Sequence, residues 1–161
     1  MNKLIVAADR KLGLAKQGFQ PWFIPDDEQY FTDQTKKYGG HVLYGSRTYE
    51  LSLLRKPLEG RQNYLLTRNK APVEGVEVVN DLDKFLKDFQ DQDLWVIGGA
   101  NVFAQVMQAG KADELYITHI EADFGCNQFF PEFDHGFKLA EKSDLHEENG
   151  FIYYYAKYVR A

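Results

Sequence analysis

The sequence predicts an α/β fold in which a mostly parallel central β-sheet is flanked by helices. Short apolar runs alternate with segments of helical spacing along most of the chain, as expected when the strands of a parallel sheet are connected through helices. The chain then ends in two strand-like segments on either side of Glu148-Asn149-Gly150, a sequence typical of an antiparallel hairpin turn. The 161 residues fit a single domain spanning residues 1–161, with about eight strands and about four helices.

In the first half of the chain, an apolar run at residues 4–8 predicts a buried strand, and a polar loop follows it at residues 9–20. Pro25 and the three acidic residues after it predict a helix start, because proline suits the first helical turn and carboxylates favour the positive end of the helix dipole. This helix should run to about Tyr38 and end at Gly39-Gly40. The other elements expected in this half are a strand at 41–44 and, after a turn at 45–48, a second helix.

The second half continues the alternation of strands and helices. Apolar residues at positions 82, 85, 86 and 89 lie on one face of a helix, which predicts a helix over 82–89. The other elements expected here are strands at 63–67, 76–79, 94–97 and 115–120, a helix at 100–109 that ends at Gly110, and the two hairpin strands at 137–145 and 151–159.

Composition and charge exclude several classes of function. The chain carries 19 Lys and Arg against 24 Asp and Glu, a formal charge of −5, which argues against a surface that binds nucleic acid. The first apolar run is too short for a signal peptide or a membrane span, so no membrane partner is expected. Cys126 is the only cysteine, which excludes an intramolecular disulfide and suits a reducing, cytoplasmic protein. We expect a monomer.

Metal and nucleophile chemistry finds little support in the residues. The four histidines, at positions 41, 119, 135 and 146, lie in different elements without metal-ligand spacing, so no metal site is expected. Cys126 has no neighbouring cation in the sequence and is expected to be an idle thiol. Neither a phosphate-binding P-loop nor a nucleophile elbow is present.

Two strand–turn–helix junctions could bind phosphate groups. One is Gly98-Gly99, after an apolar strand and before a helix, where free backbone N–H groups at the helix start would face a ligand. The other is Gly45-Ser46-Arg47-Thr48, which has the same layout with a cation and two hydroxyl groups. Two such junctions indicate a dinucleotide lying across the carboxyl ends of the strands, although simple tight turns explain each glycine equally well. The three-glycine Rossmann spacing is absent.

Asp27 is the strongest candidate for a catalytic or binding carboxylate. It follows Pro-Trp-Phe-Ile-Pro and precedes Phe31 by four residues, which puts both side chains on one helix face. A carboxylate in such apolar surroundings is costly to bury unless a ligand supplies hydrogen-bond donors, and burial would raise its pKa. The alternative is a solvated first turn in which Asp26, Asp27 and Glu28 merely complement the helix dipole.

An ordered set of motifs covers nearly the whole chain and resembles dihydrofolate reductase. The motifs are Asp9-Arg10, Pro21-Trp22, Ile24-Pro25-x-Asp27, Tyr30-Phe31, Gly45-x-Arg47-Thr48, Lys56-Pro57-Leu58-x-Gly60-Arg61, Val96-Ile97-Gly98-Gly99, Ile117-Thr118-His119-Ile120 and Phe130-Pro131. The resemblance implies the fold of that family and hydride transfer from NADPH to C6 of dihydrofolate, with protonation at N5.

The resemblance also implies the residues that bind substrate. Asp27 would accept hydrogen bonds from the pterin 2-amino group and N3, with Thr118 fixing the carboxylate and Trp22 as a further catalytic residue. Arg61 would grip the glutamate α-carboxylate, because its guanidinium can bind both oxygens, and Lys56 would help less specifically. The apolar slot for the rings would be formed by Ile5, Val6, Ala7, Phe31 and Ile97.

The cofactor residues are implied in the same way. Arg47, with Thr67 and Arg68, would receive the adenosine 2′-phosphate and favour NADPH over NADH. The full set of implied cofactor residues is Ala7, Leu14, Ala15, Gln20, Gly45, Arg47, Thr48, Thr67, Arg68, Gly98, Gly99, Ala100, Asn101, Val102, Phe103 and Gln105.

Three positions depart from the family pattern, two in the loop that closes over the nicotinamide and one in a later loop. Ala15 replaces a glycine, Gln20 replaces an apolar residue, and Asn127 stands where a carboxylate normally anchors the closed loop. The neutral Asn127 should anchor it more weakly. The departures keep two alternatives open: a relative that reduces another pterin or pyrimidine, and a non-catalytic NADPH-binding module. Which side chain of residues 51–55 contacts the benzoyl group is also open.

Overall fold

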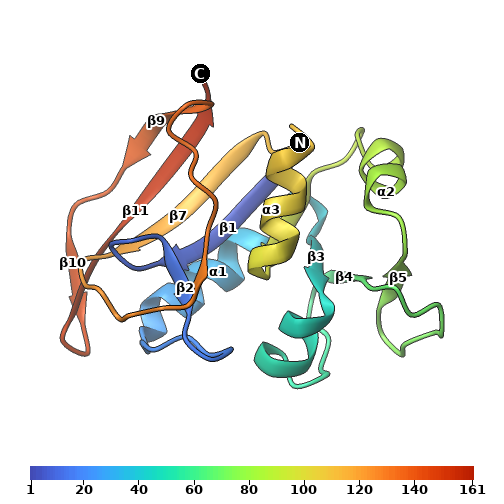
Figure 1. Cartoon of the computed structure of the whole chain (residues 1–161), viewed down its shortest axis with the longest axis horizontal. Helices are drawn as coiled ribbons and strands as arrows, with labels where there is room; N and C mark the ends of the chain where they lie inside the picture. Colours follow the sequence, from blue (N-terminus) through green and yellow to red (C-terminus); the bar gives the residue numbers. More distant parts are fainter.

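The central sheet is eight strand positions wide, in the order β10-β11-β7-β1-β6-β3-β4-β5 (Figure 1). The computed structural model describes all of residues 1–161. A ninth strand, β9, pairs with β11 along the same edge as β10 and so does not widen the sheet. The strands are β1 (Asn2–Ala8), β3 (His41–Gly45), β4 (Gln62–Leu66), β5 (Glu77–Val79), β6 (Leu94–Gly98), β7 (Glu114–Ile120), β9 (Phe137–Lys142), β10 (His146–Glu148) and β11 (Phe151–Arg160).

The sheet is mostly parallel. Strand β1 lies between β6 and β7 and is parallel to both, with Leu4 opposite Val96 on one side and Leu115 on the other. Only the pairings of β11 within this sheet are antiparallel. The central strands are continuous apolar runs because helices cover both faces of the sheet. The mixed α/β fold expected from the sequence is therefore confirmed, and the carboxyl ends of the parallel strands meet along one edge.

Four helical segments lie on the two faces of the sheet. Helix α1 (Pro25–Thr35) and a π-helical turn at Thr48–Ser52 pack against one face, together with a cluster that includes Tyr44 and Trp95. Helices α2 (Leu82–Asp88) and α3 (Ala100–Gln108) cover the other face. Figure 1 shows α3 in front of the sheet and α1 behind it.

Helix α1 ends earlier than the sequence predicts. It stops at Thr35, whose buried hydroxyl group donates back to the carbonyl of Phe31, and a short 3-10 turn follows at Lys37–Gly39. Tyr38 lies in the left-handed region at φ 56°, as do both glycines after it. A regular helix cannot continue through that conformation, so the expected helix to Tyr38 was too long.

Two further differences concern short strands. The expected loop at 9–20 contains β2 (Gly13–Ala15), which pairs with β8 (Gln128–Phe129) in a small second sheet. The expected strand at 137–145 ends at Lys142, where the chain leaves β11, and an additional strand, β10, pairs with β11 from His146 onward. A register shift at Lys157/Tyr158 in β11 lies within its pairing with β9, where Lys157 is opposite Glu141 and Tyr158 is opposite Leu139.

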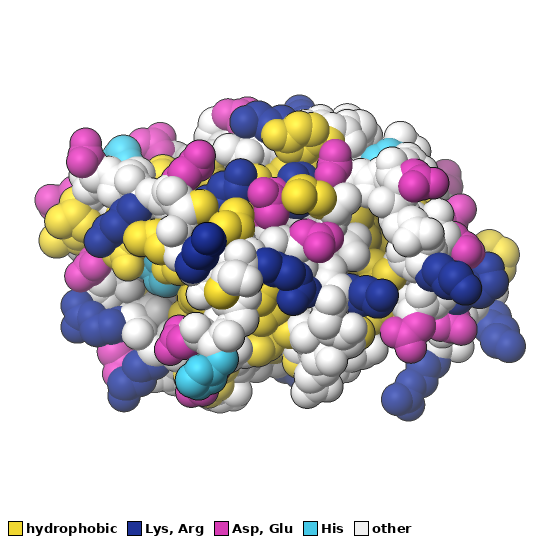
Figure 2. All heavy atoms as spheres, turned by 90° about the horizontal axis from the view of Figure 1, so that it is seen from above, with side chains coloured by type: hydrophobic (Ala, Val, Ile, Leu, Met, Phe, Trp, Pro, Cys, Tyr) yellow, Lys and Arg dark blue, Asp and Glu magenta, His cyan; other side chains and the backbone are white.

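The surface carries both signs of charge. Figure 2 shows basic and acidic side chains interspersed on the face seen from above, with apolar side chains between them. Among the helices, none has the length and apolar character that crossing a membrane requires.

Candidate active site

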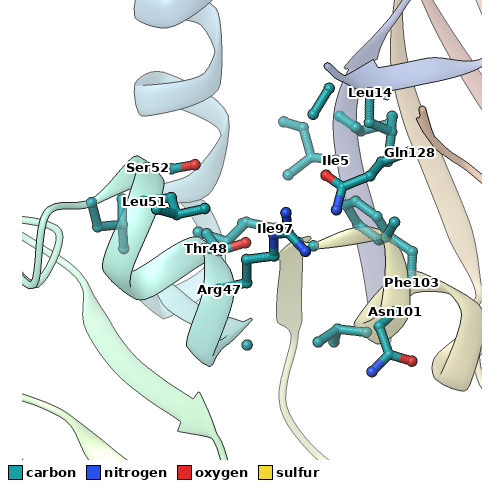
Figure 3. Close-up of a pocket in the computed structure, with 18 of the residues that line it drawn as sticks. Ile5, Leu14, Arg47, Thr48, Leu51, Ser52, Ile97, Asn101, Phe103 and Gln128 are labelled. Atoms are coloured by element: carbon teal, nitrogen blue, oxygen red, sulfur yellow. The ribbon is translucent and has the colours of Figure 1, made fainter. Parts of the chain in front are cut away.

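A cleft of about 1030 Å³ opens at the carboxyl ends of the central strands. Ile5, Gly45, Ile97 and Thr118, from β1, β3, β6 and β7, all contribute to its walls. In Figure 3, Leu51 and Thr48 lie on one side of this cleft, while Ile5, Leu14 and Phe103 lie on the other. This is the edge of an open α/β sheet where small ligands commonly bind.

Asp27 lies inside this cleft and not on a solvated helix face. Thr118, a buried residue of β7, donates its hydroxyl hydrogen to Asp27 Oδ1 at 2.7 Å. Burial raises the pKa of Asp27 to about 6, and the charge of Glu28 raises it further, while the Thr118 hydrogen bond opposes the shift. Asp26, its neighbour, is exposed instead. Of the two interpretations of Asp27 drawn from the sequence, the carboxylate in apolar surroundings therefore describes its position, and the solvated first turn does not.

An apolar slot adjoins this carboxylate. The five residues expected to form it all line the cleft: Ile5, Val6, Ala7, Phe31 and Ile97. Tyr30 also lines it, although the sequence analysis missed this residue, whose position three residues after Asp27 on the same helix is a usable signal. In the 51–55 segment, Leu51, Ser52 and Leu53 face the cleft, whereas Leu54 and Arg55 do not.

Arg61 supplies a cation at the edge of the cleft. Its Nη1 donates to Thr35 Oγ1 at 3.0 Å, and its Nε donates to the carbonyl of Glu59 at 3.0 Å. Partial burial lowers the pKa of Arg61, although a guanidinium stays charged at any physiological pH. Two of its donors are therefore held by the protein while the rest remain free for a carboxylate. Lys56, by contrast, is exposed and lies outside the cleft lining.

The glycine junctions lie close to other parts of the site. A Cβ atom added to Gly98 or Gly99 would approach Thr48 Oγ1 to 3.1 or 3.3 Å, and one on Gly45 would reach within 2.8 Å of Val102 Cγ2. Gly98 also has a φ of 140°, which side chains rarely allow. Gly99 precedes α3, whose first N–H groups therefore open toward the cleft.

All sixteen residues expected at the cofactor positions line the cleft. Two of the three basic side chains on its walls, Arg47 and Arg68, belong to this set, and Arg47 points into the cleft in Figure 3. Ser46, from the second glycine junction, also lines the cleft. The wall residues to which the sequence assigned no binding role are Gly18, Phe19, Glu28, Tyr30, Thr32, Leu51, Ser52, Leu53, Leu58, Leu66, Asn80, Leu82 and Gln128.

Trp22 is placed differently from the other candidate residues. Its side chain is buried outside the cleft lining and packs against Phe124, with the ring centroids 5.4 Å apart. Ala7 and Ile24 belong to the same apolar cluster. The structure therefore places Trp22 behind the wall of the cleft.

The loop at 9–20 is attached to a second loop at 121–127. Asn127 Oδ1 accepts a hydrogen bond from the backbone N–H of Gln17 at 3.2 Å, and the N–H of Asn127 donates to the carbonyl of Ala15 at 3.0 Å. Gln20, farther along the first loop, is exposed and lines the cleft. The neutral side chain at position 127 therefore makes an anchoring contact.

Comparison with known proteins identifies the family. The family model described as dihydrofolate reductase matches residues 1–160. The dihydrofolate reductases of Aedes albopictus and Heliothis virescens are 31% and 32% identical, covering 96% and 94% of this chain and 95% and 92% of their own. The structure of the Enterococcus faecalis dihydrofolate reductase complexed with NADP(H) and RAB-propyl superposes with a TM-score of 0.87 at 26% identity, over 99% of this chain and 96% of that one. On this evidence the chain belongs to the dihydrofolate reductase family.

Proposed function

We propose that this protein reduces 7,8-dihydrofolate to tetrahydrofolate with NADPH, adding a hydride at C6 and a proton at N5. The observation that supports this most directly is a carboxylate, Asp27, held by Thr118 inside a cleft large enough for two ring systems. Because the chain has one cysteine, and because its surface carries interspersed charges of both signs (Figure 2), we propose a cytoplasmic enzyme that acts as a monomer.

Asp27 would orient the pterin ring. Its carboxylate has two oxygens, of which Oδ1 already accepts the Thr118 hydroxyl hydrogen. The remaining lone pairs can accept hydrogen bonds from the 2-amino group and N3 of the pterin, a pair of donors that suits a carboxylate. Thr118 keeps the carboxylate in one orientation, so that both donors meet it at the same time.

Asp27 also favours protonation at N5. With a pKa of about 6, it exchanges protons near neutral pH, where an ordinary aspartate would remain fully ionised. A proton drawn from solvent can pass through a water molecule to N5 while the negative charge of Asp27 stabilises the cationic ring. The apolar slot around it excludes other water and strengthens this interaction.

The cleft has room and charge for NADPH, which supplies the hydride when bound. Arg47 and Arg68 would hold the 2′-phosphate, with Thr67 as a hydroxyl donor. The space left free of side chains at Gly98 and Gly99, beside the start of α3, suits the pyrophosphate. Ala7 and Ile97 would hold the nicotinamide against the pterin ring, since both side chains are apolar and line the cleft.

Arg61 would select the substrate through its tail. Its guanidinium is preoriented by Thr35 and Glu59, so binding a carboxylate costs less side-chain entropy. A substrate without a distant carboxylate would leave this cation unused. This observation favours dihydrofolate over a smaller pterin or pyrimidine.

The test is the NADPH-dependent loss of dihydrofolate absorbance, with and without an antifolate, in wild type and in two variants. Asp27→Asn should lower kcat/KM at least 100-fold, while Asp26→Asn, its exposed neighbour, should leave the rate within twofold of wild type. Equal rates for wild type and Asp27→Asn would remove Asp27 from the mechanism. Tight NADPH binding without turnover of wild type would favour the non-catalytic module, and faster turnover of a non-folate heterocycle would favour the divergent reductase.

A further inference from the structure

Asp9 is a buried carboxylate that the proposed mechanism does not use. It follows the last residue of β1, is only 1% exposed, and has no Lys, Arg or His within ion-pair distance. An unpaired buried charge is costly, so such a group is retained only where hydrogen bonds compensate it. The partners of Asp9 therefore indicate what it does.

Those partners are backbone N–H groups from two separate loops. Asp9 Oδ1 accepts hydrogen bonds from Lys11 N at 2.9 Å and from Gly13 N at 2.7 Å, both in the first loop. Its other oxygen, Oδ2, accepts from Phe124 N at 3.1 Å, in the second loop. One carboxylate thus joins the segment that leads into β2 to the segment that precedes β8. Hydrogen bonds to an ionised acceptor are about twice as strong as neutral ones.

The first loop packs closely against this carboxylate at Gly13. A Cβ atom added to Gly13 would come within 2.8 Å of both Asp9 oxygens and 2.6 Å of Cys126 Cβ. Burial raises the pKa of the Cys126 thiol to about 11, and the charge of Asp9 adds to the shift, so the thiol stays protonated and can donate to Asp9. Arg10 reinforces the junction through its N–H, which donates to the carbonyl of Ala122 at 2.8 Å.

Both loops held by Asp9 lead to the cofactor side of the cleft. Leu14 and Ala15, directly after Gly13, line the cleft wall. Phe124, whose N–H is held by Asp9, packs against Trp22 behind the same wall. The dihydrofolate side is built instead from α1, Arg61 and the paired strands β1 and β7, to which the Asp9 side chain makes no hydrogen bond.

We propose that Asp9 is a positioning residue for NADPH: it fixes the loop wall formed by Leu14 and Ala15 against the cofactor and leaves the dihydrofolate subsite unchanged. A carboxylate is required because its two oxygens serve donors that approach from two loops. Asparagine offers one acceptor oxygen, and its amide group would oppose an N–H group of the other loop. The proposal rests on the proposed function only in naming NADPH as the cofactor.

The experiment measures binding by calorimetry, with NADPH and dihydrofolate titrated separately into wild type, Asp9→Asn and Asp9→Ser. The control is Asp123→Asn, which removes an exposed carboxylate of the second loop that accepts from Gly125 N and pairs with Lys11 of the first loop at 3.0 Å. An exposed ion pair of this kind contributes little to stability, so the control separates the buried carboxylate from a surface charge between the same two loops. We expect both Asp9 variants to weaken NADPH binding at least tenfold, to change dihydrofolate binding less than threefold, and to raise the KM for NADPH more than they lower kcat. The control should bind both ligands within twofold of wild type.

Equal losses for the two ligands, or unchanged NADPH affinity in the Asp9 variants, would overturn the positioning role. Failure of both variants to fold, judged by circular dichroism, would also overturn it, because Asp9 would then be a determinant of folding. If wild type itself does not bind NADPH, the proposed function fails first. The two failures are therefore distinguishable.

Discussion

Thr118 and Asp27, 91 residues apart in the chain, meet through a hydrogen bond of 2.7 Å in which the Thr118 hydroxyl is the donor. The contact joins the middle of the sheet to the first turn of α1. It lowers the pKa of Asp27 against a larger upward effect of burial, and the balance leaves that pKa near 6.

Replacing Thr118 by valine should raise the pKa of Asp27. Valine keeps the shape of the buried side chain but removes the donor that stabilises the ionised carboxylate, so we expect the pKa to rise by about one unit. The carboxyl carbon of Asp27, assigned by comparison with Asp27→Asn, reports this by ¹³C NMR titration. Thr118→Ser keeps the hydroxyl and should titrate like wild type; a valine variant that does the same would contradict the prediction.

Removing the carboxylate should stabilise the protein at neutral pH. The folded protein holds the Asp27 proton more tightly than the unfolded chain, since the pKa rises from 3.8 to about 6 on folding. The free energy of unfolding of wild type should therefore fall as pH rises from about 4 to about 6, and level off above that range. Asp27→Asn, which retains an oxygen to accept from Thr118, should be more stable than wild type by about 1 to 3 kcal/mol at pH 7.5.

Urea unfolding at several pH values measures this difference. The two proteins should converge below pH 4, where the Asp27 carboxyl group is protonated in both the folded and the unfolded states. A variant that is less stable than wild type at pH 7.5 would show that Asp27 is not desolvated in solution.

Arg61→Leu should weaken the binding of dihydrofolate while leaving a tail-less pterin unaffected. The guanidinium is aimed by Thr35 and the carbonyl of Glu59, and a bidentate bond to a carboxylate is lost on substitution. We expect KM for dihydrofolate to rise about 100-fold in Arg61→Leu, which corresponds to a loss of about 2.7 kcal/mol in binding free energy. The KM of Arg61→Lys should lie between those of wild type and Arg61→Leu. Lys56→Met should change KM less than twofold, because Lys56 lies outside the cleft. Equal losses for dihydrofolate and the tail-less pterin would contradict a role in binding the tail.

Much of this architecture can be predicted from the sequence because its signals are local. The apolar runs at β1, β6 and β7 are long enough to identify buried strands, and the acidic residues after Pro25 identify the start of α1. Strand ends in a parallel sheet gather at one edge, which is why the two glycine junctions could be assigned to one site. The assignment of Ile5 and Thr118 to the same cleft came from the resemblance to dihydrofolate reductase.

The remaining features depend on packing between distant segments. Strands β2 and β8 have three and two residues, too few for periodicity to identify them. Lys56 follows a turn whose direction no local pattern determines, and its side chain faces solvent. Trp22 is buried because Phe124, about 100 residues later, covers it, and no residue near Trp22 in sequence indicates that contact.

Replacing Asn127 by aspartate should tighten NADPH binding. The oxygen of Asn127 accepts from the N–H of Gln17 at 3.2 Å, a long contact for a neutral amide, and this bond attaches the loop that carries Ala15 and Gln20 to the second loop. A carboxylate in the same position makes a shorter and stronger bond, so the closed arrangement gains stability relative to an open one. We expect the Kd for NADPH to fall about 3- to 10-fold and NADP⁺ release to slow by a similar factor, whereas Asn127→Ala should act in the opposite direction. Stopped-flow displacement of NADP⁺ measures the release rate, and equal rates in all three proteins would show that Asn127 does not control the loop.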